Sequence, residues 1–241
     1  MDFYQNSKKI LQKLIEQHQI IDEKIKVISA RTLTPEEAIG NPECKDFPLL
    51  KGREVMVEAV FRQSKGQAYT NMPGEFTGSV RELLSLPLED NFQRAIYIAG
   101  LNAIMHHYGQ ISNTIHCRDQ EPGICASQLP DYINKHYGKP KIAFIGFQPA
   151  MIDKLSHSFE LRVIDLDEDN IGKEKFGLTI EGPEKTEEVL SWGDIILATG
   201  STSVNATVDR FIHDKPVVFY GVTIAGMATI HKLQRYCPCA H

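Results

Sequence analysis

The chain has 241 residues, of which 42% are hydrophobic and 24% are charged, and it carries a formal net charge of −5 at pH 7. This length suits one large domain or two modest ones, and the composition is that of an ordinary soluble globular protein. Because the chain is acidic and has no concentrated basic run, a nucleic-acid partner is not expected. Its apolar stretches are too short to span a membrane.

The cysteine count and the first residues indicate a compartment. The chain begins MDFYQ, which has neither the basic nor the apolar segment of a secretory signal. Five cysteines, an odd number, do not suggest a disulfide framework. We therefore expect a cytoplasmic protein whose thiols are free or bound to metal.

The first half of the chain predicts an α+β unit. Apolar residues at helical spacing predict a helix over 6–19. Residues 55–61 are typical of a strand, and 66–70 are its expected partner across a turn at 64–66. A short helix is expected over 79–85, and Asp90 is expected to cap a longer one that reaches His106.

The second half predicts strands that alternate with helices. The strands are expected at 141–146, 161–166, 194–200 and 216–221, and the helices at 150–155, 204–212 and 225–233. Strands that are apolar on both faces and alternate with helices indicate a doubly wound parallel sheet. The predicted fold class is therefore α/β, with an α+β domain over 1–125 and the parallel-sheet domain over 126–241.

Three of the predicted parallel strands end in glycine, at Gly146, Gly200 and Gly221. In such sheets ligands collect beyond the carboxyl ends of the strands, where the strand order reverses. Each glycine turn leads into a predicted helix, whose free N–H groups favour a polar or anionic ligand. The turn after Gly200 also has an interpretation without a ligand, in which its serine and threonine residues only cap the start of a helix, as they commonly do.

Asp165 lies about twenty residues beyond the first glycine turn, the spacing of an acid that binds a ribose in dinucleotide sites. However, the turn reads Gly-Phe-Gln-Pro-Ala from Gly146, without the GxGxxG fingerprint. Phe147 would obstruct the close approach of a pyrophosphate. NAD is therefore not the expected cofactor.

Soft metal ligands occur in two places. The connection between the halves holds His116, Cys117 and Cys125, and the last residues, YCPCAH, hold Cys237, Cys239 and His241. Thiolates and imidazoles suit zinc, copper(I) or iron, although the spacing matches no standard zinc signature. The alternatives are buried cysteines that pack as small hydrophobes and a frayed chain end. Following the last predicted helix, the tail is expected at the edge of the sheet opposite the ligand crevice, unless it folds back.

Seven segments carry a family resemblance, namely 58–60, 66–70, 94–96, 99–103, 193–202, 205–207 and 221–223. Their order and spacing resemble those of the DUF364/DUF4213 proteins, whose proposed role is heavy-metal chelation or handling of a metal-chelating small molecule. The resemblance implies an enolase N-terminal-like α+β domain joined to a Rossmann-like domain, with a site in the cleft between them. By position, the matching ligand-binding candidates are Glu58, Tyr69, Arg94, Asn102, Thr199, Gly200, Ser201, Thr202, Asn205, Gly221 and Thr223.

Three functions remain open from the sequence. The first is binding of a small polar or anionic ligand in the interdomain cleft, linked to a thiophilic divalent metal. The second is an enzyme of unknown reaction, in which Arg94 anchors an acidic group and Glu58 or Tyr69 moves a proton. The third is a non-catalytic homo-oligomeric binding module whose cysteines only pack.

Overall fold

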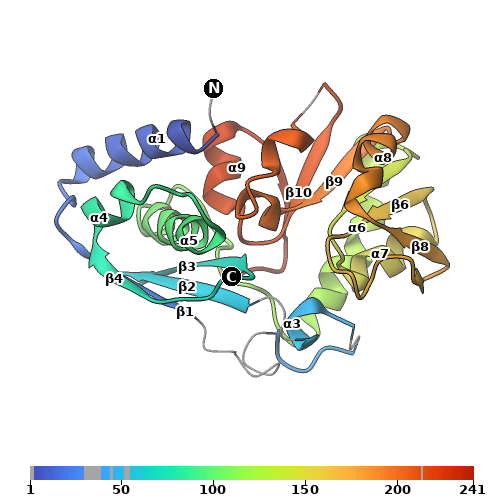
Figure 1. Cartoon of the computed structure of the whole chain (residues 1–241), viewed down its shortest axis with the longest axis horizontal. Coiled ribbons are helices and arrows are strands. Elements are labelled where there is room, and N and C mark those ends of the chain that lie inside the picture. The colour runs from blue at the N-terminus through green and yellow to red at the C-terminus, as the bar shows by residue number, and fades with distance from the viewer. Residues whose placement is uncertain (1–2, 30–38, 44–45, 52–54, 213) are drawn as a thin grey trace.

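A computed structural model describes residues 3–29, 39–43, 46–51, 55–212 and 214–241 of the chain (Figure 1). Its helices are α1 Phe3–His18, α3 Pro48–Lys51, α4 Val80–Ser85, α5 Asn91–His107, α6 Glu121–Tyr137, α7 Pro149–Ser156, α8 Thr186–Trp192 and α9 Ala225–His231. Its strands are β1 Lys24–Ser29, β2 Val55–Phe61, β3 Ser64–Thr70, β4 Phe76–Ser79, β5 Ile142–Ile145, β6 Leu161–Ile164, β7 Glu174–Lys175, β8 Leu178–Glu181, β9 Ile195–Thr199, β10 Val217–Tyr220 and β11 Gln234–Tyr236. Within these residues, no helix combines the length and the apolar character that a membrane crossing needs.

The first sheet is antiparallel and has the order β3-β2-β1-β4. The predicted pairing of β2 with β3 is confirmed, but the turn falls at Arg62 and Gln63, two residues earlier than expected. Arg62 takes up a left-handed conformation with φ of 53°, which makes this tight turn possible. The sequence did not reveal β1 and β4; β1 lies next to a stretch that reads as irregular.

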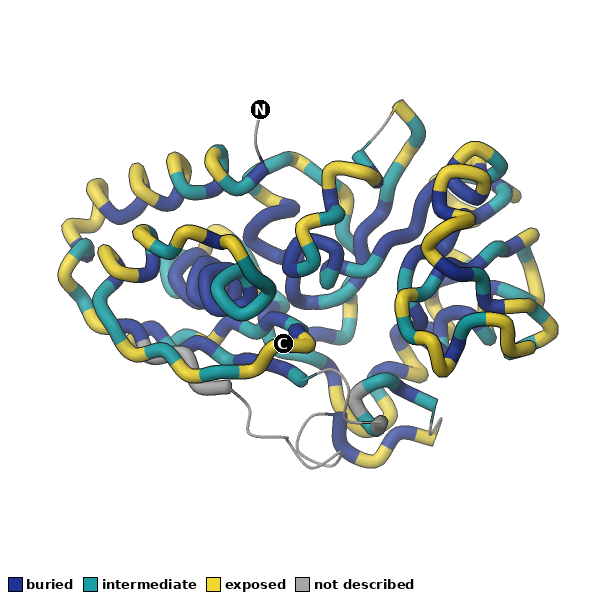
Figure 2. Tube along the Cα trace, in the orientation of Figure 1, coloured by how far each residue is buried: buried dark blue, intermediate teal, exposed yellow. Residues whose placement is uncertain are grey.

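Helix α5 lies across this sheet and forms the centre of the first half (Figure 1). Asp90 accepts a hydrogen bond from the Gln93 backbone N–H at 2.8 Å, so the predicted cap is confirmed. Residues 95–105 of α5 are buried without interruption, as Figure 2 shows. A helix that is buried on all sides is apolar around its whole circumference, not along a single stripe. It can therefore pack against a second layer as well as against its own sheet.

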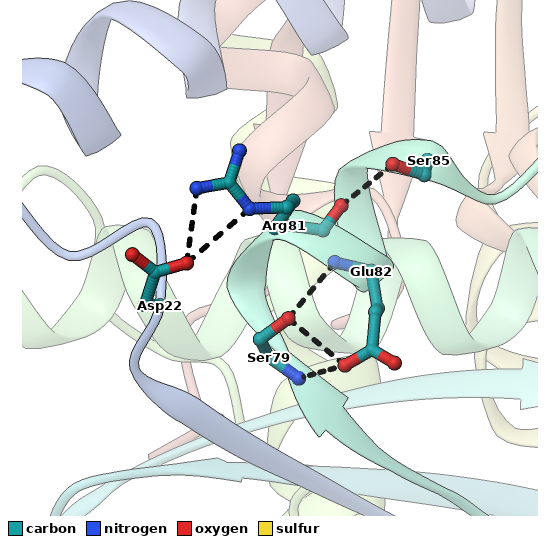
Figure 3. Close-up of polar contacts among 5 residues, drawn as sticks. All are labelled: Asp22, Ser79, Arg81, Glu82 and Ser85. Carbon is teal, nitrogen blue, oxygen red and sulfur yellow. Dashed lines mark hydrogen bonds and ion pairs between the residues drawn. The ribbon is translucent and has the colours of Figure 1, made fainter.

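Helix α4 begins with a capping box, seen in Figure 3. The Ser79 hydroxyl accepts from the Glu82 N–H, and the Glu82 carboxylate accepts from the Ser79 N–H at 2.7 Å. Arg81 forms an ion pair with Asp22 at 3.0 Å, which links α4 to the segment before β1. These contacts fix the short helix that was expected over 79–85.

The second sheet has the order β11-β10-β9-β5-β6-β8-β7, and its pairs are parallel except for β7 with β8. The four strands predicted from the sequence are β5, β6, β9 and β10, so the α/β class is confirmed. The chain runs outward from β5 in one direction through β6 and then returns to the other side with β9. The strand order therefore reverses between β5 and β9, next to Gly146 and Gly200.

Helices cover both faces of the second sheet. Ile142 and Phe144 face a core formed with α6 and α7, whereas Ala143 and Ile145 belong to the core shared with α5 and α9. This alternation explains why the strand is apolar throughout. The predicted helix over 204–212 is wrong: Gly200–Ser203 and Val208–Phe211 form two short 3₁₀ turns instead. Helix α6 contains both sides of the boundary expected at 125/126.

Helix α1 is attached to the second half through its first turn. The rings of Phe3 and His231 stack with centroids 4.0 Å apart, and His231 Nε2 donates to the Phe3 carbonyl oxygen at 3.0 Å. The Tyr4 hydroxyl donates to the Ser203 carbonyl oxygen at 2.6 Å. Thus α1 and α9 are joined although they come from opposite ends of the sequence.

Acid is expected to weaken this junction. Burial lowers the pKa of His231 below its ordinary value of 6.5 in the folded chain. As the pH falls below about 6.5, the unfolded chain binds a proton more readily than the folded one, and the free energy of unfolding decreases. A His231→Phe variant keeps the ring stack without the titrating group. Urea unfolding at pH 7 and pH 5 should show a smaller acid-induced loss for the variant; an equal loss in both proteins would contradict the expectation.

Candidate functional site

A cavity of about 800 Å³ opens at the carboxyl ends of β5, β9 and β10. Its lining includes the turns that follow these strands, the end of β3, and the segment that precedes α6. The residues that matter below are Tyr69, Asn71, Asn91, His116, Cys117, Cys125, Gly146, Phe147, Gln148, Asp165, Thr199, Gly200, Ser201, Thr202, Asn205, Gly221, Thr223 and Cys237. The cavity therefore lies where the strand order reverses, as expected for an open parallel sheet.

Two glycines at strand ends give the cavity its form. Gly146 and Gly221 both have φ of 93°, a conformation that L side chains rarely adopt. A Cβ atom at Gly146 would lie 2.7 Å from Thr199 Cγ2 and 3.0 Å from the Tyr220 hydroxyl. A Cβ atom at Gly221, which also lines the cavity, would meet no described atom within 4 Å.

Three N–H groups in or just after these turns are engaged within the protein. The Met151 N–H donates to the Gln148 side chain, the Ser201 N–H to Thr199 Oγ1, and the Gly226 N–H to Asn102 Oδ1. The turn after Gly200 leads into a 3₁₀ turn and the one after Gly221 into a helix of only 7 residues. The expectation of a helix start is therefore wrong for the turn after Gly200, whereas the turns after Gly146 and Gly221 do lead into α7 and α9.

The first half of the chain contributes a polar wall. Asn91 Nδ2 donates to Asn71 Oδ1 at 2.8 Å and to Asn205 Oδ1 at 3.2 Å, which links the two halves at the cavity. The Tyr69 N–H donates to Thr223 Oγ1 at 3.0 Å. Asn91 and Asn71 were not predicted as site residues, and their only sequence signal is an amide side chain next to a strand end or a helix start.

Eight of the predicted ligand-binding residues line the cavity, namely Tyr69, Thr199, Gly200, Ser201, Thr202, Asn205, Gly221 and Thr223. Glu58, Arg94 and Asn102 are not among the lining residues. Glu58 forms an ion pair with Lys65 at 2.8 Å and accepts from the Gln67 side chain.

Arg94 and Asn102 support the cavity from behind. The Arg94 guanidinium donates to the carbonyls of Leu88 and Val204 and to Asn91 Oδ1, and so it orients an asparagine of the polar wall. Asn102 is fully buried and bridges β3 to the turn after β10. These bonds hold Arg94 outside the cavity lining, and its expected role as an anchor for an acidic ligand group stays a prediction.

The tail lies at the same edge of the sheet as the cavity. Helix α9 ends at His231, and Lys232 then adopts the left-handed conformation with φ of 57°. The next residues form β11, which pairs parallel to β10 and returns the chain to the carboxyl edge. The expectation that the tail lies opposite the crevice is therefore wrong, because this short strand of Gln234, Arg235 and Tyr236 was not recognised in the sequence.

The tail is held in place by backbone and side-chain contacts. The backbones of His241 and Ile115 bond to each other in both directions, at 2.7 and 2.9 Å. Asn113 Nδ2 donates to the Cys237 carbonyl oxygen at 3.1 Å, and His241 Nε2 lies 2.9 Å from a carboxylate oxygen of Glu121. A frayed chain end would have none of these contacts, so this alternative is excluded.

The tail places its cysteines close to those of the interdomain connection. Cys117, Cys125, Cys237 and Cys239 are free thiols, and the first three line the cavity. Burial raises the pKa of each thiol above its ordinary value, and the charges of neighbouring thiols raise the pKa of Cys117 and Cys125 further. The four thiols are therefore protonated at neutral pH.

His116 completes this side of the cavity. Burial lowers its pKa to about 4, so the imidazole is neutral at physiological pH. Its Nδ1 atom is buried and has no hydrogen-bond partner among the described residues. Its ring meets the Tyr69 ring edge to face, with centroids 5.5 Å apart. A neutral imidazole with an unused nitrogen is a competent soft-metal donor.

The fit of these residues to a metal is partial. Thiols and a neutral imidazole are the donor types that thiophilic metals prefer. However, within the described residues no group of three or more His, Cys, Asp or Glu side chains is arranged to hold an ion. A closed tetrahedral zinc site is thus not formed by these residues, and neither Cys239 nor His241 lines the cavity.

Asp165 follows β6 and lines the opposite side of the cavity. Burial raises the pKa of its carboxyl group. The carboxylate accepts from the Leu166 N–H and from Asn170 Nδ2, each at 2.7 Å. These bonds orient Asp165 within its own loop, while the Phe147 turn next to it still lacks the second glycine of a dinucleotide site.

Comparisons with known proteins relate part of the chain to a family. Residues 131–230 match DUF364, whose description is "Putative heavy-metal chelation". A DUF364 protein of unknown function from Pyrococcus horikoshii has the same fold, with a TM-score of 0.53 and 16% identity over 92% of this chain and 80% of that one. A second, from Desulfitobacterium hafniense DCB-2, has a TM-score of 0.51 and 12% identity over 73% of this chain and 72% of that one. No curated protein matches. Residues 131–230 of the chain are thus similar to the DUF364 family, and its fold is similar to that of two solved DUF364 proteins.

Proposed function

We propose that the chain binds a small metal-chelating molecule, or its heavy-metal complex, in the cavity at the carboxyl ends of β5, β9 and β10. The observation that supports this proposal is the composition of the cavity wall. One side presents hydroxyl and amide groups, including Ser201 and Asn205, and another presents His116 and three thiols. The first kind of group suits an organic ligand and the second suits a soft metal.

The size of the cavity supports an organic ligand over a bare ion as the main occupant. Its volume of about 800 Å³ falls within the range of small-molecule sites, roughly 300–1,000 Å³. The polar wall offers amide and hydroxyl groups to such a ligand. The lining also includes the Asp165 carboxyl, which would favour a ligand that carries a cation.

We also propose a domain type for each half of the chain. The first half, with its antiparallel sheet and α5, would be the enolase N-terminal-like domain, and the second would be the Rossmann-like domain, divided near residue 125. In this arrangement the cavity is an interdomain cleft. The bonds from Asn91 to Asn205 and from Tyr69 to Thr223 would then hold the two domains in register around the ligand.

A thermal-shift screen tests the proposal. Nucleotides, S-adenosylmethionine and aromatic carboxylates are tested with and without a heavy metal such as Cd²⁺, since a ligand that binds only the folded state raises the midpoint. We expect at least one chelator with metal to raise the midpoint more than either component alone. Gly221→Ala, whose methyl group would enter the cavity, should abolish this additional shift.

Gly138→Ala is the matched control for this variant. Gly138 has φ of 74° and open space at the Cβ position, but it lies at the end of α6 and is not a lining residue. It should therefore carry a similar conformational cost and retain the ligand-dependent shift. A shift that survives in Gly221→Ala would show that binding occurs elsewhere and would overturn the proposal.

A further inference from the structure

Four thiols from two distant segments gather on one side of the cavity. Cys117 and Cys125 lie just before and within α6, and Cys237 and Cys239 lie in the tail. Cys117, Cys125 and Cys237 line the cavity, and Cys239 packs against the apolar cluster that contains Cys125. We call these four side chains the thiol wall.

The backbone around the thiol wall is held by hydrogen bonds from side chains to carbonyl oxygens. Arg235 donates to the carbonyls of Gly221, Ser112 and Asn113, which ties β11 both to the cavity turn and to the connection. The Tyr236 hydroxyl donates to the Cys125 carbonyl oxygen at 2.7 Å. These bonds hold the tail, with Cys237 and Cys239, against the segment that carries Cys117 and Cys125.

His116 provides an independent sign of a missing partner. Its buried Nδ1 has no hydrogen-bond partner in the described part of the chain, and the residue lines the cavity beside Cys117. Buried polar atoms are normally satisfied, because leaving one without a partner costs roughly 1–3 kcal/mol. A buried nitrogen without a partner, in a cavity wall that also holds thiols, is the arrangement expected where a metal ion binds to these groups.

We propose that the thiol wall, with His116 Nδ1 as an auxiliary donor, captures a soft monovalent metal ion such as Cu(I) or Ag(I). Thiolates select such ions, for which two donors suffice, whereas structural zinc requires four in a tetrahedron. The described residues offer no ready group of three or more donors, which disfavours zinc and leaves low coordination open. This inference rests on the proposed function, because the wall belongs to the same cavity, and it identifies the metal class.

Capture involves ligand exchange without oxidation or reduction. Each participating thiol forms a sulfur–metal bond as its S–H bond breaks, and the proton passes to the solvent. A monovalent ion held by two sulfurs therefore releases two protons and keeps its charge. The imidazole of His116 needs no proton transfer, because it is neutral before the ion arrives.

Competition for Cu(I) tests the inference. Reduced, metal-free protein is titrated anaerobically with Cu(I) against a chromophoric copper(I) chelator, in a Cys44→Ser background so that only the four thiols of the wall contribute. We expect one tightly bound ion per chain. The double variant Cys117→Ser, Cys237→Ser should bind more weakly by more than about a hundredfold, since loss of outer partners alone costs roughly 10–100-fold. His157→Gln, which removes an exposed imidazole, is the control and should leave affinity unchanged.

A second measurement keeps the test informative if the double variant folds poorly. Alkylation of the otherwise intact protein, read by mass spectrometry, should show that one equivalent of Ag(I) protects thiols of the wall. Absence of protection, or equal Cu(I) affinity in the double variant, would overturn the inference. If the organic chelators still raise the thermal midpoint in those experiments, the proposed function stands and only the thiol-wall ion is rejected.

Discussion

Replacement of Asn102 by leucine is expected to lower the free energy of unfolding by about 3 kcal/mol. The Asn102 side chain is fully buried and donates to the carbonyls of Gln67, Val222 and Thr223. Its oxygen accepts from the N–H of Gly226 in the first turn of α9 at 2.8 Å. Leucine would fill a similar volume but leave these buried groups without the partner that joins the first half to the second.

Two further variants separate this effect from a general cost of substitution. Asn134 lies exposed on α6, and Asn134→Leu should change the free energy of unfolding by less than about 0.5 kcal/mol. Asn102→Asp keeps the acceptor for Gly226 but turns a carboxylate towards three carbonyls, so its penalty should grow as the pH rises above about 4. Urea unfolding measures all three. A loss for Asn102→Leu no larger than that of Asn134→Leu would show that the bridge does not join the two halves.

Gly146→Ala is expected to be markedly more destabilising than Gly221→Ala, although both positions have φ of 93°. The left-handed conformation costs each alanine about 1–2 kcal/mol. At Gly146 the new methyl group would also overlap Thr199 and the Tyr220 hydroxyl, which adds about 1–3 kcal/mol. The Tyr220 hydroxyl is held by the Ile145 carbonyl oxygen at 3.1 Å, so it cannot move aside without losing that bond.

The comparison of the two glycine variants isolates the packing at the strand end. Urea unfolding should give a loss of about 3 kcal/mol for Gly146→Ala and about 1 kcal/mol for Gly221→Ala. Stabilisation by the ligand should be lost in Gly221→Ala and retained in Gly146→Ala, since only the Gly221 methyl group would enter open space in the cavity. An equal decrease in the free energy of unfolding for both variants would mean that Thr199 and Tyr220 move aside at little energetic cost.

Much of the fold could be predicted from the sequence, because its principal elements have strong local signals. The Asp90 cap and the continuous apolar strands around Phe144 and Leu197 are examples that the structure confirms. The failures share a physical cause. Strands β1, β4 and β11 are stabilised by pairing with distant segments, and the helix expected over 204–212 is interrupted at Ala206, whose φ is 55°.

The candidate site could be predicted in part for the same reason. Glycines at the ends of parallel strands identify the edge of the sheet, and most of the residues proposed there line the cavity. Residue type alone does not reveal partners, however. Arg94 and Asn102 looked like ligand contacts, but their donors are engaged by backbone carbonyls. The proximity of the tail to Cys117 depended on β11, three residues that have no strong strand pattern.

The role of the cavity in metal handling is tested most directly by an anomalous difference map at the copper edge, from crystals of the reduced protein loaded with one equivalent of Cu(I). A single strong peak bonded to sulfurs of the thiol wall, facing the turns after β9 and β10, is the predicted result. Copper found only at exposed histidines such as His157, with Cys117 and Cys237 unligated, would contradict both the thiol-wall ion and its place in the cavity.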